Sequence, residues 1–157
     1  HDRVRRSLDL LRRLRDYLRG HGHGCDDSAR QAARDVLRYF DIAAPLHHED
    51  EELHVFPPLL AQEHDAPLVT LVRQLQRDHV RMAERWATAR GPLQAMADGQ
   101  LPAFSAEHEA ALDGFAECYA DHLRHEDDSI YPAARALLDP GAQSAMGQEM
   151  ARRRGVR

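Results

Sequence analysis

Two segments far apart in the chain carry the same pattern of histidine, glutamate and proline, and this repeat limits the folds open to the chain. Residues 47–57 read HHEDEELHVFP and residues 122–132 read HLRHEDDSIYP, so both fit H-x-x-x-E-[ED]-x-x-[VI]-[FY]-P. Residues four apart lie on one face of a helix, with Cβ atoms about 5–6 Å apart. The repeat therefore predicts two helices that each present an imidazole and a carboxylate on the same side.

Apolar residues recur at three- and four-residue steps over most of the chain, which predicts amphipathic helices. Asp26, Asp27 and Ser28 are candidates to cap the second helix, and Pro45 predicts a kink or short break within it. We expect four long helices, over about residues 1–19, 28–60, 67–90 with a tail to 96, and 105–126. The fourth helix is expected to continue after an interruption at Pro132, and a short fifth helix is expected over about residues 142–153.

The spacing of these helices predicts the fold class. No window alternates with period two, so the expected strand content is near zero. Four long helices with short connections predict an all-α fold: an antiparallel up-down-up-down four-helix bundle with a short extra C-terminal helix. The 157 residues are enough for one domain with a proper core, so residues 1–157 are expected to form a single domain.

Each of the four long helices carries a residue on its apolar face that can bind a metal. Burying an unpaired carboxylate on such a face lowers the stability of the fold by roughly several kcal/mol, unless a cation neutralises the charge. Histidine and carboxylate ligands without thiolate suit iron, manganese or zinc. We therefore predict two iron ions, with manganese or zinc as alternatives, bridged by oxygen and held by His1, His47, Glu51, His79, His122 and Glu126.

The register of each pair leaves an alternative open. His48 and Glu52 have the same spacing as His47 and Glu51. Aligning the two Pro-containing ends places His47 on His122, which favours the earlier pair. In the second segment, Asp127 competes with Glu126 as the carboxylate.

Composition excludes several classes of protein. The net charge is −5, and no basic face with interleaved aromatic residues is visible, which argues against nucleic-acid binding. No apolar run approaches about 18 residues, so no membrane span is expected. The two cysteines do not make a disulfide framework, so a reducing cytoplasm is the expected location. The first residue is His1 and not Met, so further residues upstream are expected.

The order H … HxxxE … H … HxxxE, with [FY]-P after each HxxxE, resembles the hemerythrin-like, or HHE cation-binding, family. The resemblance extends from His1 to about Leu138, and the tail GQEMARRRG also resembles the end of bacterial members. It implies a four-helix bundle around a non-haem di-iron centre, with the six residues named above as ligands. Classical oxygen carriers have another histidine four residues after the third-helix ligand, where this chain has Ala83.

The resemblance implies a protein that binds or senses dioxygen or a related small oxidant, such as peroxide or nitric oxide. Two alternatives stay open: a di-iron enzyme that consumes peroxide, with Tyr119 as a possible proton donor, and a metal-stabilised structural or partner-binding domain. A binding protein is favoured over an enzyme. The sequence does not indicate an oligomeric state.

Overall fold

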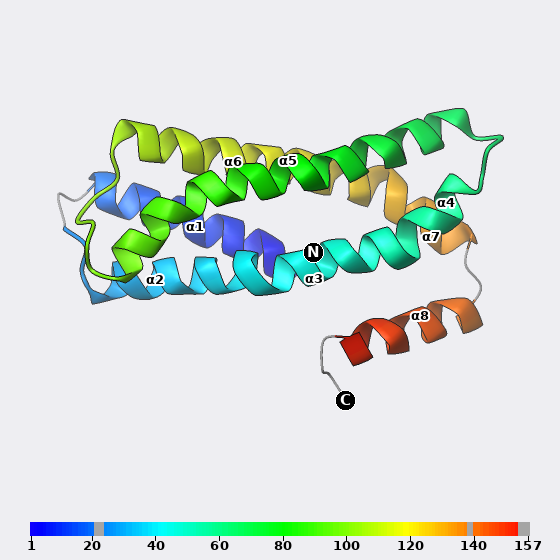
Figure 1. Ribbon diagram of the computed structural model, residues 1–157, viewed down its shortest axis with the longest axis horizontal. Helices are drawn as coiled ribbons and strands as arrows, with labels where there is room; N and C mark the ends of the chain where they lie inside the picture. Colours follow the sequence, from blue (N-terminus) through cyan, green and yellow to red (C-terminus); the bar gives the residue numbers. More distant parts are fainter. Residues whose placement is uncertain (21–23, 138–139, 154–157) are drawn as a thin grey trace. The chain divides into compact units, whose positions relative to one another are not determined.

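The computed structural model describes residues 1–20, 24–137 and 140–153, and all of its regular secondary structure is helical (Figure 1). None of these described residues forms a strand. In chain order the elements are α1 (Asp2–Gly20), α2 (Asp27–Arg38), η1 (Tyr39–Ala43), α3 (Ala44–Asp50), η2 (Glu51–Val55), α4 (Phe56–Leu60), α5 (Ala66–Ala97), α6 (Ala106–His125), η3 (Glu126–Ile130), α7 (Tyr131–Leu137) and α8 (Pro140–Arg153), where η denotes a π-helix.

The chain divides into two compact units. The first contains residues 1–44 and 80–120, and the second contains residues 45–79 and 121–157. Both long helices, α5 and α6, therefore contribute one part to each unit. Each unit has its own buried residues, and the two are taken in turn.

The first unit is built on the apolar stripe of α1 and a cluster of aromatic rings. Phe40 lies at the centre of this cluster, with its ring centroid 5.0 Å from Phe115, 5.2 Å from Trp86 and 5.4 Å from Tyr119. Trp86 donates its indole N–H to Asp41 at 2.8 Å, so the polar end of the ring is satisfied. The stripe of α1 is buried along its whole length, at Val4, Leu8, Leu11, Leu14 and Leu18.

The second unit has a separate apolar core. It is formed by Val55, Phe56, Leu59, Val72, Leu75, Ile130 and Ala134, which come from η2, α4, α5, η3 and α7. Met150 of α8 packs against this core from the C-terminal end of the chain. Five of its seven residues, Val55, Phe56, Leu59, Ile130 and Ala134, come shortly after the two HxxxE motifs in sequence, so the core anchors the helical turns that carry these motifs.

Each of the three π-helices ends two residues before a proline: Pro45, Pro57 or Pro132. Proline cannot donate to the carbonyl four residues earlier, and its ring collides with that carbonyl. The preceding turn widens instead, so that Phe56 donates its N–H to the carbonyl of Glu51, and Tyr131 donates to that of Glu126. Both turns begin at the glutamate of an HxxxE motif, so the prolines shape the backbone at these two residues.

The helices follow the sequence expectations with local differences. The all-helical class and the short C-terminal helix are confirmed, and Asp26 caps α2 by accepting the N–H of Ala29 at 2.8 Å. The break expected near Pro45 is a π turn instead. Helix α5 continues past Gly91 and Pro92 to Ala97 without interruption. Within the described ranges, the helices are too short or too polar to cross a membrane.

Candidate metal centre

Two glutamates of the second unit are almost completely buried. Glu51 opens η2 and Glu126 opens η3, and each is 1% exposed. They are the glutamates of the two HxxxE motifs, so both motifs direct a carboxylate into the protein. A buried carboxylate is stable only where hydrogen bonds or positive charge compensate for its lost hydration.

Two buried histidines lie against these carboxylates in the same manner. His79 places Nε2 3.0 Å from Oε1 of Glu51 and Nδ1 2.8 Å from Oε1 of Glu52. His122 places Nε2 3.3 Å from Oε1 of Glu126 and Nδ1 3.3 Å from Oδ2 of Asp78. In both rings, a carboxylate lies at Nδ1 and a buried glutamate lies at Nε2.

A carboxylate on the far nitrogen of an imidazole is the usual support of a metal-binding histidine, because it orients the ring and raises its basicity. Here Glu52 supports His79, and Asp78 supports His122. Metal-binding histidines held in this way present Nε2 to the ion. The outer partners therefore leave Nε2 of both rings directed at the buried carboxylates.

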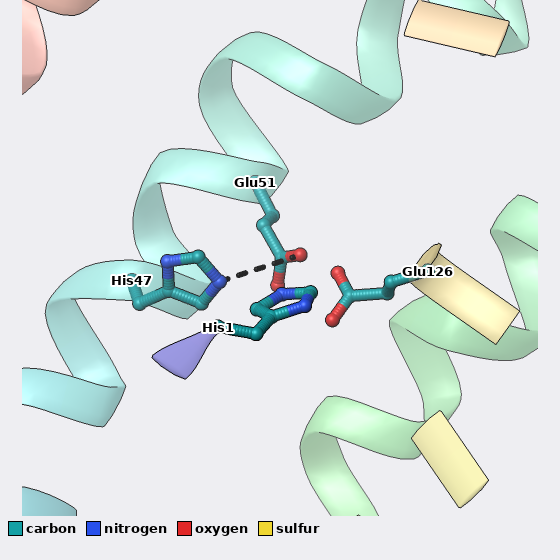
Figure 2. A group of neighbouring side chains, drawn as sticks. All are labelled: His1, His47, Glu51 and Glu126. Atoms are coloured by element: carbon teal, nitrogen blue, oxygen red, sulfur yellow. Dashed lines mark ion pairs between the residues drawn. The ribbon is translucent and has the colours of Figure 1, made fainter. Parts of the chain in front are cut away.

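Donor atoms in the second unit gather around Glu51. Figure 2 shows the imidazole of His47 and the carboxylate of Glu126 turned toward Glu51, with donor atoms within 4.8 Å of one another. His48 and His79 form a second group with Glu51, also within 4.8 Å, and their rings stack with centroids 4.2 Å apart. Both groups contain Glu51, so this carboxylate belongs to two candidate sets of metal ligands.

The pKa values of Glu51 and His79 are shifted in opposite directions. Burial would raise the pKa of Glu51, but the hydrogen bond from His79 and the surrounding imidazoles lower it below its ordinary value. Burial would lower the pKa of His79, but Glu51 and Glu52 raise it instead. The contact between His79 and Glu51 contributes to both shifts, so each side chain favours the charged form of the other.

The pKa of His48 is shifted in the opposite direction from that of His79. Burial, followed by repulsion from His79, lowers the pKa of His48 to about 3, although Glu51 acts to raise it. The ring is therefore neutral at ordinary pH. A neutral imidazole keeps a lone pair available for a metal ion.

The second unit contains five of the six residues predicted as ligands: His47, Glu51, His79, His122 and Glu126. His1 precedes α1 in the first unit, and its place in the centre remains a prediction. Glu51 is buried, whereas the side chain of Glu52 is 36% exposed and lies at the outer nitrogen of His79. His48 joins the donors by stacking on His79 and forms a candidate group with Glu51.

Three residues make polar contacts in the centre that were not predicted from the sequence. Asp78 and Glu52 support the two imidazoles from outside. The hydroxyl of Tyr131 donates to Oε2 of Glu51 at 2.8 Å and lies 3.2 Å from Nε2 of His47. Tyr131 is the aromatic residue before the second proline, and its counterpart Phe56 lacks a hydroxyl, so this difference between the repeats was the available signal.

Comparison with known proteins agrees with this geometry. Residues 1–134 match the model of the hemerythrin HHE cation binding domain. An uncharacterized protein of Haemophilus influenzae is 30% identical over 158 aligned positions, which cover 100% of this chain and 87% of that protein. The family match contains both HxxxE repeats and ends before α8. The chain therefore belongs to the hemerythrin HHE cation-binding family.

Proposed function

We propose that this chain binds two iron ions and that the loaded centre binds or senses dioxygen or a related small oxidant, such as peroxide or nitric oxide. The observation that carries the proposal is the arrangement shared by His79 and His122, with an outer carboxylate at Nδ1 and a buried glutamate at Nε2. The proposed ligands are His1, His47, Glu51, His79, His122 and Glu126, and His48 is the competing donor in the second helix.

The donor set suits the proposed ions. Imidazole nitrogen and carboxylate oxygen without thiolate are ligands that iron shares with manganese and zinc. Six protein ligands do not fill the coordination of two ions, so positions are left for an oxygen bridge or a small molecule. When bound, iron would supply the redox chemistry and the affinity for a small oxidant that protein side chains lack.

The residues of this chain have separate tasks in the proposal. Glu51 neutralises charge and is shared between the two groups of donors. Glu52 and Asp78 orient the rings of His79 and His122. Burial of both glutamates excludes water and strengthens their attraction for a cation.

We propose an antiparallel up-down-up-down four-helix bundle as the fold around this centre. The match over residues 1–134 supports it, because the family match includes all four long helical stretches. Scattering in solution would test the bundle, and a profile too extended for one compact domain would contradict it.

Metal analysis tests the proposal most directly. We expect about two iron ions per chain and an optical spectrum that differs between air and an oxygen-free atmosphere. His122→Ala should lose most of the metal, whereas His64→Ala, at an exposed turn between α4 and α5, should retain it. Equal iron content in both variants would contradict the ligand assignment. Full iron content with identical spectra under both atmospheres would contradict dioxygen binding.

A second candidate function, peroxide consumption, is favoured by Tyr131. Its hydroxyl is hydrogen-bonded to Glu51 and can move a proton at Oε2 of that carboxylate. An enzyme of this kind should turn over peroxide when loaded with iron, and Tyr131→Phe should slow turnover while leaving the iron content unchanged. A metal-stabilised structural or partner-binding domain predicts a different result. In that case metal raises the melting temperature of the protein, and no small molecule alters the optical spectrum of the metal-loaded protein.

A further inference from the structure

Helix α8 contacts the turn that carries Glu51, although it lies outside the residues that match the family model. Arg153, in its last turn, pairs through Nη2 with Asp50 and through Nη1 with Oε1 of Glu49 at 2.8 Å. One guanidinium group therefore binds the two residues that immediately precede Glu51.

The pair with Asp50 lies in a buried position. Asp50 is 2% exposed and stands next to Glu51 in a run of four acidic residues, 49–52. A buried carboxylate beside other carboxylates is stable only with a positive partner. The planar fork of arginine can bind two carboxylates at once, which lysine cannot do with the same geometry.

Glu149 extends the contact to the other side of Glu51. Its carboxylate receives Nε of Arg153 at 3.0 Å and also contacts Nε2 of His54. Met150 adds an apolar contact with the core of the second unit. The end of α8 therefore holds α3 before Glu51 and η2 after it.

We propose that Arg153 is a positioning residue for the metal centre, which it serves by fixing the helical turn from which Glu51 projects. This inference rests on the proposed metal-binding function. Partners outside the ligand shell commonly change metal affinity by about 10–100-fold when they are removed. Arg153 acts through Asp50 and Glu49 and has no need to touch the ion.

Two measurements on the full chain test this inference, one with metal and one without. In the metal-free protein, Arg153→Gln should speed hydrogen exchange of the amides from Glu51 to Phe56 by about tenfold or more, because charge-assisted hydrogen bonds are lost. In a cobalt(II) titration followed by visible absorption, the same variant should bind the ion about tenfold more weakly. Arg152→Gln, at an exposed neighbouring position of α8, is the control and should change neither.

A second substitution distinguishes positioning from a loss of folding. Asp50→Asn removes the buried charge that Arg153 neutralises. The double variant with Arg153→Gln and Asp50→Asn should therefore bind cobalt more tightly than the single variant Arg153→Gln. Unchanged exchange in Arg153→Gln would overturn the inference, as would faster exchange with unchanged affinity. Faster exchange in a protein whose wild-type form takes up no cobalt would instead contradict the proposed metal centre while supporting the contact of α8 with this turn.

Discussion

Replacing Glu126 by Gln should change the stability of the protein in opposite directions with and without metal. The substitution keeps the shape of the side chain and removes its charge. Glu126 is 1% exposed, and its carboxylate lies within 4.8 Å of that of Glu51. The metal-free protein therefore contains two buried carboxylates at close range, whereas the loaded protein is proposed to use both of them as ligands.

The distance between these carboxylates sets the size of the effect. Two like charges separated by at most 4.8 Å repel each other by about 3 kcal/mol or more at an effective dielectric constant of about 20. Neighbouring imidazoles offset part of this repulsion, so we expect Glu126→Gln to raise the unfolding free energy of the metal-free protein by about 1–3 kcal/mol. A rise of this size corresponds to roughly 2–10 °C in melting temperature for a chain of this length.

Metal binding should reverse the order of stability. A metal concentration about 1,000 times the dissociation constant stabilises the folded state by about 4 kcal/mol. A 100-fold loss of affinity in the variant would remove about 2.7 kcal/mol of that stabilisation. The variant then loses about 2.7 kcal/mol of metal stabilisation against a gain of about 1–3 kcal/mol from the lost repulsion, so the order of stability reverses wherever that gain is below about 2.7 kcal/mol.

Thermal melting with chelator and with added ferrous salt measures both states. Asp128→Asn is the matched control, because it removes one charge from an exposed position of the same turn. We expect this control to stay within about 0.5 kcal/mol of the wild type in both states. A Glu126→Gln variant that is destabilised equally with and without metal would refute the electrostatic reasoning.

Three further changes test the local physics of the centre. His48 has a pKa of about 3 in the folded protein against an ordinary 6.5. As the pH falls, this side chain is therefore protonated in the unfolded chain before it is protonated in the folded protein. The metal-free wild type should lose about 2 kcal/mol of unfolding free energy between pH 8 and pH 5, and His48→Gln should not show this loss. If urea titrations showed that the wild type and His48→Gln lose the same unfolding free energy between pH 8 and pH 5, the predicted sign would be wrong. Tyr131→Phe removes the bond to Glu51 and should cost about 1–2 kcal/mol by urea denaturation; no cost would mean that the bond adds no net stability. Pro132→Ala restores an N–H donor and should convert η3 to α-helix, as a crystal structure would show; a π turn that persists would mean that proline is not its cause.

The sequence predicted the helices because their signals are local. The stripe of α1 and the cap at Asp26 each depend on residues within a few positions of one another. Two of the π turns were foreseen, only as a kink or short break at Pro45 and an interruption at Pro132. Whether a helix breaks or widens at a proline depends on the packing on either side, and here Val55, Phe56 and Ile130 are held by the core of the second unit.

The buried glutamates were also predictable from the repeat, but their surroundings were not. Asp78 is one residue from His79 in sequence, yet it supports His122. His54 contacts Glu149, which lies 95 residues later in the chain. Such partners depend on which helix faces meet in three dimensions, and the spacing of residues along one helix contains no information about that.

The π turns at Glu51 and Glu126 have a consequence for one-residue deletions in these helices. A π turn holds about one residue more than an α turn, and one residue of an α-helix corresponds to a rotation of about 100°. Deleting Ser129 should therefore remove the extra residue, restore an α turn and leave Glu126 close to its present phase relative to Ile130, which belongs to the apolar core. The same deletion within an α turn meets no extra residue and rotates the helix beyond it by about 100°, so the π turn is the place where this helix tolerates the loss of one residue.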